Sequence, residues 1–103
     1  MAELITILGA TFTTGSRGGR TSTLKTIENV LGRAYNENVE EIDGKQTEVK
    51  EFVFKKKPFL GFIKDAGYTT KDISLRLNDD SVYQPREFQT VGNRILIKAY
   101  KDE

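Results

Sequence analysis

The spacing of apolar residues and turn signals predicts an α+β fold with a mixed or antiparallel sheet, one main helix and one short helix. Three observations support it: an apolar run near the start, a stretch with helical spacing after it, and an Asp-Gly turn between two strand-forming segments. The expected order is β-α-β-β-α-β plus a C-terminal hairpin, and its first six elements match the ferredoxin-like arrangement. A different sheet with one long helix packed on a face fits the pattern almost as well.

The first strand is expected over residues 3–12, which read ELITILGATF and are apolar on both faces. Such strands usually lie inside a sheet that is covered on both sides. Four apolar residues then recur with the spacing of one helix face. They are Leu24, Ile27, Leu31 and Ala34. We therefore expect the main helix here, with Thr21 or Ser22 capping its start.

Turn residues locate the next two elements. Asp43-Gly44 is a strong hairpin signal and separates two strand-forming arms, residues 39–42 and 46–55. Pro58 suits the first turn of a helix and Gly67 the position after its end. A short helix is therefore expected over residues 59–66.

The C-terminal third reads as short strands. Residues 73–77 alternate apolar and polar side chains, which predicts a half-buried strand. A turn at residues 78–80 leads to a short segment at Val82-Tyr83 that Pro85 is expected to end. The last strand is expected over residues 94–100, after a turn at Gly92-Asn93.

Length and composition indicate one soluble domain over residues 1–103. The 103 residues include 37% hydrophobic and 30% charged residues, which is a globular rather than a disordered composition. The apolar run at the N-terminus is short, contains Glu3 and has no basic residue before it, so we expect no signal peptide. No run is long enough for a membrane span. We expect a cytoplasmic protein that does not contact a membrane.

The chain contains neither cysteine nor histidine. This excludes disulfides, thiolate or imidazole metal sites and nucleophilic triads that use histidine. Adjacent acids occur at Glu40-Glu41 and Asp79-Asp80, but neighbours on a strand point to opposite faces and form no ready site. We therefore expect no catalysis, no catalytic residues, no metal and no cofactor.

A Gly/Arg-rich segment, TTGSRGGRTST at residues 13–23, lies between the expected first strand and main helix. Backbone N–H groups at a helix start and arginine side chains both suit phosphate. The predicted phosphate or nucleic-acid contacts are Arg17, Gly18, Gly19, Arg20, Thr21, Ser22 and Lys25. The segment matches neither the Walker A nor the G-x-G-x-x-G spacing. An ordinary flexible connection is the alternative interpretation.

A second group of predicted contacts is the lysine run Lys55, Lys56 and Lys57. Basic residues beside exposed aromatic rings suit single-stranded nucleic acid. A solvated sheet edge is the alternative, because lysines there discourage aggregation. Residues 37–51 are acidic, with six acids against two lysines, and predict a solvent-facing ribbon or a protein-contact surface.

These features favour a small, non-enzymatic accessory protein that binds DNA or RNA through the Gly/Arg-rich segment and the lysine run. The alternative function is a protein–protein interaction module, such as a small inhibitor or assembly factor, that uses a sheet face or an edge strand. A binder of a small phosphorylated ligand is a third hypothesis. A homodimer is compatible with each of them.

Overall fold

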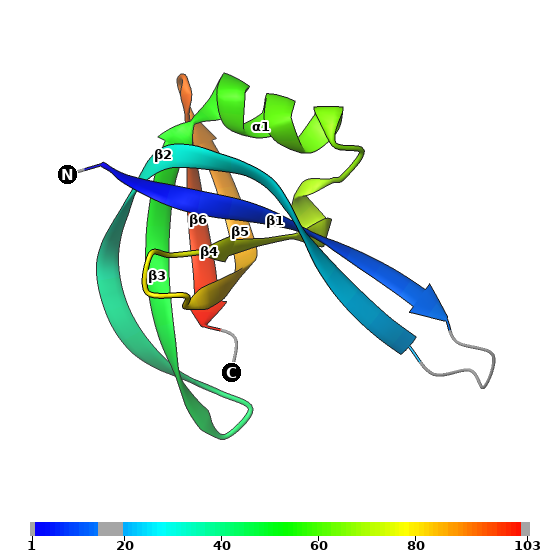
Figure 1. Cartoon of the computed structure of the whole chain (residues 1–103). Helices are drawn as coiled ribbons and strands as arrows, with labels where there is room; N and C mark the ends of the chain where they lie inside the picture. The colour runs from blue at the N-terminus through cyan, green and yellow to red at the C-terminus, as the bar shows by residue number, and fades with distance from the viewer. Residues whose placement is uncertain (1, 15–19, 102–103) are drawn as a thin grey trace.

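The computed structural model describes the backbone of residues 2–14 and 20–101, and the side chains of residues 2–10 and 24–101. Six strands form a closed antiparallel barrel in the order β1-β2-β3-β6-β5-β4 (Figure 1). The strands are β1 (Glu3–Thr14), β2 (Arg20–Ile42), β3 (Lys45–Lys55), β4 (Ile73–Arg76), β5 (Val82–Val91) and β6 (Arg94–Lys101). The helix α1 (Lys56–Asp65) lies across one end of the barrel, and a 3₁₀ turn, η1 (Thr70–Asp72), precedes β4.

The predicted α+β fold with a ferredoxin-like order is therefore wrong. The described part of the chain holds one α-helix rather than two, and the structure is close to all-β. Every strand pair is antiparallel, and the sheet closes through β1 and β4. The β-α-β-β-α-β order fails because the expected main helix is a strand.

The stretch expected as the main helix is the middle of β2. Ile7 of β1 lies opposite Glu28 and Leu8 lies opposite Thr26, so Ile27 is an extra residue in a β-bulge. A bulge breaks the two-residue alternation of a strand, and here it imitates helical spacing. Leu24 and Leu31, placed on one helix face by the pattern, are both exposed.

A second correction concerns Pro85, which does not end a strand. β5 continues through it to Val91. The pairing of β5 with β6 shifts in register between Pro85 and Glu87, so the proline lies beside a bulge. A proline is tolerated at such a point because a regular ladder hydrogen bond is already missing there.

The expectations that rest on turn residues are confirmed. Asp43 and Gly44 have φ angles of 52° and 80°, which are the two positive values of a type I′ hairpin turn. α1 covers the expected short helix but begins three residues earlier, at Lys56. Gly67 follows it with φ of 83°. The strands expected at 73–77 and 94–100 appear as β4 and β6.

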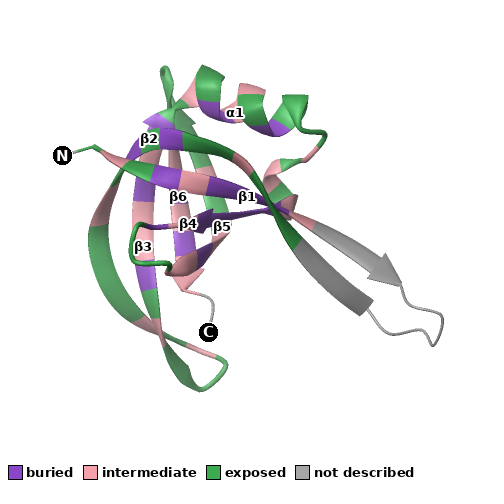
Figure 2. Ribbon diagram, viewed as in Figure 1, coloured by how far each residue is buried: buried purple, intermediate pink, exposed green. Residues whose placement is uncertain are grey.

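A column of aromatic rings fills the barrel along its axis. Tyr83 meets Phe52 edge-on, with ring centroids 5.8 Å apart, and Phe52 stacks on Phe54 at 6.4 Å. Phe54 in turn stacks on Phe59 of α1 at 4.6 Å, so the column reaches the helix. All four rings are buried (Figure 2). Isoleucine and leucine side chains from β1, β4 and β6 surround them.

Gly32 of β2 leaves room for the Phe54 ring of this column. A Cβ atom at Gly32 would lie 2.4 Å from the ring of Phe54, well inside van der Waals contact. The absence of a side chain therefore allows β2 to cross directly over the ring.

We predict that Gly32→Val lowers the free energy of unfolding by about 1–3 kcal/mol, because the new side chain must displace Phe54. Gly61→Ala is the matched control. A Cβ at Gly61 would meet nothing within 4 Å, and alanine is the better helix former by about 1 kcal/mol. Urea unfolding of both variants measures the difference. A Gly32→Val protein as stable as the wild type would contradict this role for Phe54.

Candidate functional site

The first candidate is a two-stranded arm, here defined as residues 10–14 of β1 and 20–24 of β2. Their backbones pair in register from Ala10 opposite Leu24 to Thr14 opposite Arg20. The pairing of β1 with β4 ends at Gly9, and the pairing of β2 with β3 begins only at Arg33. The arm therefore leaves the barrel, and in the described chain neither of its outer edges pairs with another strand (Figure 1).

The root of the arm is tightly packed, unlike its edges. Leu8 is buried and pairs with Ser74 of β4. The ring of Tyr68 covers the next residue, Gly9, where a Cβ atom would lie 2.5 Å from it. This packing fixes the point at which the arm leaves the barrel.

The second candidate is an apolar groove beside α1, of about 810 Å³. Its exposed apolar residues are Leu4, Leu31 and Phe62, with exposed fractions of 52%, 63% and 37%. Leu4 and Leu31 are direct partners across β1 and β2, so they form one outward-facing pair. The floor consists of Gly32 and Phe54, the same contact that positions the aromatic column.

Three exposed cations border this groove. Arg33, Lys55 and Arg94 all line it, and Lys55 lies directly opposite Arg94 in the β3–β6 pairing. No acid of the described chain lines it, and the ion pairs found there involve none of the three. A neighbouring hollow of about 460 Å³ continues from it, because Arg33 and Arg94 line both. We call the two together the basic groove.

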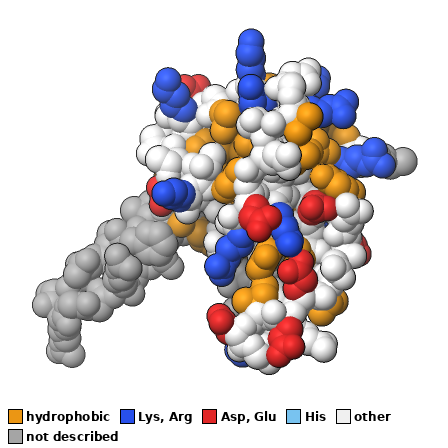
Figure 3. All heavy atoms as spheres, turned by 180° about the vertical axis from the view of Figure 1, so that it is seen from behind, with side chains coloured by type: hydrophobic (Ala, Val, Ile, Leu, Met, Phe, Trp, Pro, Cys, Tyr) orange, Lys and Arg blue, Asp and Glu red, His pale blue; other side chains and the backbone are white. Residues whose placement is uncertain are grey.

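The opposite end of the barrel carries the acids. We call it the acidic end and define it as residues 37–51 with the turn at 78–80. The three ion pairs of the described residues all lie there or reach it from β6. They are Lys50–Glu37 at 3.1 Å, Lys98–Glu40 at 3.0 Å and Lys101–Glu48 at 3.2 Å. Figure 3 shows acidic side chains gathered on this lower half and lysines and arginines around the helix end.

Lys50 of β3 is a partly buried cation at the acidic end. Its ammonium group bonds to the Glu37 carboxylate and lies 5.4 Å from the centroid of the Tyr83 ring. Burial lowers the pKa of Lys50, but the hydrogen bond to Glu37 and the nearby negative charge outweigh it, so the pKa is raised overall. Burial likewise raises the pKa of the Tyr83 hydroxyl, against the opposing effect of Lys50.

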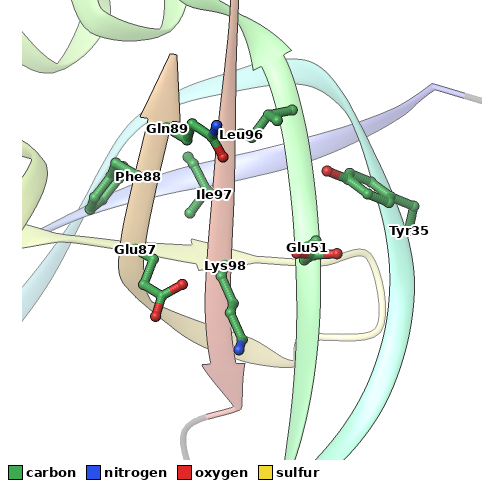
Figure 4. A pocket seen from close by; sticks show the side chains of 8 residues that line it. All are labelled: Tyr35, Glu51, Glu87, Phe88, Gln89, Leu96, Ile97 and Lys98. Atoms are coloured by element: carbon green, nitrogen blue, oxygen red, sulfur yellow. The ribbon is translucent and has the colours of Figure 1, made fainter. Parts of the chain in front are cut away.

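A hollow on the outer face of β2, β3, β6 and β5 is lined by polar side chains, of which Tyr35, Glu51 and Lys98 bear on chemistry (Figure 4). Burial raises the pKa of Tyr35, and the charge of Glu51 raises it further. Glu51 accepts a hydrogen bond from Asn36 at 2.7 Å, and Lys98 pairs with Glu40. The Glu51 carboxylate and the Lys98 ammonium group are thus each partnered by a neighbouring polar side chain.

No group of three or more acidic, cysteine or histidine side chains suited to a metal ion occurs among the described residues. In the same part of the chain, no helix has the length and apolar composition that a membrane crossing requires.

The predicted site residues do not come together. Arg17, Gly18 and Gly19 lie outside the described residues, and Arg20, Thr21 and Ser22 are described only as backbone of β2. Lys25 is exposed and pairs with Gly9 at the arm root. Lys55, Lys56 and Lys57 lie where β3 passes into α1, on the far side of the barrel from the arm (Figure 1).

One argument for the Gly/Arg-rich segment is wrong. Its phosphate-binding geometry relied on a helix beginning near Thr21, and that residue belongs to β2. In the described part of the chain, no helix begins at this segment to supply a dipole or free N–H groups. The hypothesis of a small phosphorylated ligand at a helix start therefore loses its physical basis.

Sequence reasoning missed the basic groove. Its residues come from both strands of the β1–β2 pair and from β3, α1 and β6. Arg33 and Arg94 stand 61 positions apart in the chain. The one available signal was the pair Leu4 and Leu31, which were assigned to buried faces.

The ion pair between Lys50 and Glu37 leads to a prediction about how stability depends on pH. Because the pKa of Lys50 is raised in the folded state, the pair stabilises the fold below the ordinary lysine pKa of about 10.4. That stabilisation is lost as the pH rises through the raised value. We expect Glu37→Gln to lower the pKa of Lys50, because burial then dominates, and ¹³Cε chemical shifts followed against pH measure it. Glu41→Gln is the control and should leave the pKa unchanged; an unchanged pKa in Glu37→Gln would contradict the assignment.

Comparison with known proteins adds a fold likeness. No family model matches the chain, and no curated protein does. A chain from a solved structure titled "Virion of native gene transfer agent (GTA) particle" is similar, with a TM-score of 0.73 and 12% sequence identity. The match covers 97% of this chain and 94% of that one. At this identity the likeness shows a shared fold.

Proposed function

We propose that this protein is a non-catalytic assembly module that binds another protein through its β1–β2 arm. The observation that carries the proposal is that residues 10–14 and 20–24 pair only with each other, beyond the last contact of β1 with β4. The rest of the sheet is closed into a barrel. The arm extends beyond it, and neither of its outer edges pairs with another strand of the described chain.

Backbone chemistry explains why such an arm suits a partner. A two-stranded ribbon alone is marginally stable in water, and its outer N–H and C=O groups remain free to pair. A partner strand or groove that pairs with them gains main-chain hydrogen bonds. The arm would thus be stabilised by the complex that it forms.

Two further observations support this proposal. The radius of gyration is 14.2 Å, against about 13 Å expected for a compact chain of this length, and the molecule measures 46 × 37 × 24 Å. The chain is thus extended by a projecting element. The chain of similar fold belongs to a virion particle, which is a protein assembly.

We predict that a photoreactive p-benzoylphenylalanine placed at Thr14 or Arg20 forms a covalent adduct with one discrete protein. Both positions lie at the outer end of the paired arm. The variants are expressed in cells that normally produce the protein, irradiated, and analysed by mass spectrometry. Gln89, on the exposed face of β5, is the control position and should give no such adduct. Nuclease treatment should leave the adduct intact.

An arm-less variant tests the same point independently. Ala10 and Leu24 are cross-strand partners, so an Asn-Gly turn can join them in place of residues 11–23. The thermal midpoint should persist, because the core side chains lie outside the arm. Adducts that form equally at Gln89, or that disappear with nuclease, would contradict the proposal.

Nucleic-acid binding is the second candidate, favoured by the basic groove. Lys55 lies there beside Arg33 and Arg94 without a neutralising acid among the lining residues. Phosphates would be attracted to such a surface, and the attraction would fall steeply with salt.

On this second candidate, Arg33→Ala with Arg94→Ala should reduce the slope of log affinity against log salt by about two, one for each lost phosphate contact. Arg17→Ala with Arg20→Ala tests the Gly/Arg-rich segment in the same way. Fluorescence anisotropy with single- and double-stranded oligonucleotides at two salt concentrations provides the data. No binding at low salt would eliminate nucleic acid as the partner.

A further inference from the structure

We propose that the basic groove binds the acidic end of a second copy of this chain, head to tail. The inference goes beyond the arm: it concerns other surfaces and stands or falls separately. It rests on the shape of the groove, on the complementary chemistry of the acidic end, and on the positions of the two surfaces.

The groove has the composition of a protein-binding surface. Leu4, Leu31 and Phe62 form an exposed apolar strip over β1, β2 and α1. Exposed Val91 and half-buried Leu96 extend the strip into the adjoining hollow. An apolar centre bordered by charges is the usual arrangement of an interface. Its occupant must bring apolar atoms and negative charge.

The acidic end supplies both. Val39 is 55% exposed and stands on β2 between Glu37 and Glu41, two positions away on each side. Residues two apart on a regular strand share a face, so the exposed Val39 side chain lies beside the Glu41 carboxylate. Glu48, directly opposite Val39 on β3, adds a second carboxylate, and within the chain Glu48 and Glu37 pair with Lys101 and Lys50.

The distribution of charge determines which surface of one copy faces which surface of the other. Arg33, Lys55 and Arg94 lack an ion-pair partner within the described chain, whereas at the acidic end Glu41 is exposed and likewise forms none of the ion pairs found there. Unlike charges on facing surfaces steer two copies together, and like charges disfavour contact of groove with groove. Figure 3 shows the acids gathered on the lower half, with basic side chains also among them, and lysines and arginines around the helix end.

The two surfaces cannot meet within one molecule. Nine residues of β2 separate Arg33 from the turn at Asp43, about 30 Å along an extended strand. They lie at opposite ends of the barrel (Figure 1). A contact between different surfaces on two copies is heterologous, so it continues from copy to copy into a ring or an open chain.

The test is charge reversal followed by mixing, measured by sedimentation velocity of the full chain at low and high salt. The wild type should associate with increasing concentration, more weakly at high salt. Arg33→Glu/Arg94→Glu and Glu41→Lys/Glu48→Lys should each weaken self-association at least about tenfold, because each places like charges across the contact. An equimolar mixture should restore association, since every groove again faces an end of opposite charge. Restoration also shows that both variants are folded.

A pair of variants tests the apolar part. Leu31→Asn in the groove should weaken association, whereas Thr26→Asn, at an exposed position of β2 outside the arm and both surfaces, should not. A monomeric wild type at up to about 1 mM in low salt would overturn the inference, as would no restoration in the mixture. Association that requires the arm but ignores both charge reversals would overturn it too, while the proposed function stands. If the mixture restores association but the arm gives no photoadducts, the head-to-tail contact stands and the proposed function of the arm is overturned.

Discussion

The contact between the Phe54 ring and Gly32 is the constraint on which the rest of this structure depends. It allows β2 to pass over the aromatic column at the distance of a bare backbone. The same ring stacks on Phe59, which fastens α1 across the end of the barrel. Phe54 of β3 therefore joins β2 to the β3–α1 segment, which lies about twenty residues further along the chain. Its outer side is the floor of the basic groove, so core packing and the candidate interface share one residue.

Barrel closure leaves two kinds of surface with different chemistry. Pairing closes the sheet into a barrel, and at the arm β1 and β2 extend beyond their neighbours. The side chains divide by charge: the ion pairs of the described residues cluster around the acidic end, while the helix end holds cations without acids beside them in the groove. Backbone pairing is thus the chemistry available to the arm, and apolar contact with charge attraction is that of the groove. The two proposals follow this division.

Helical spacing in β2 was misleading for a physical reason. The bulge at Ile27 adds one residue to one strand, so apolar positions drift from a period of two toward the spacing of a helix. Threonine, valine and isoleucine in the same stretch favour a strand, but propensity is a weak determinant beside tertiary pairing. β2 becomes a strand because β1 and β3 offer it hydrogen bonds over nearly its whole length.

By itself the sequence determined the features that depend on local backbone conformation. The Asp43-Gly44 and Gly92-Asn93 turns, the short helix beside Pro58 and the strands β4 and β6 were all predicted, because turn residues and alternation act within a few positions. Only the tertiary structure decided the barrel, the arm and the basic groove. Each joins residues distant in the chain, as Arg33 and Arg94 are, and a bulge or a missing Cβ changes what they meet without changing the local pattern.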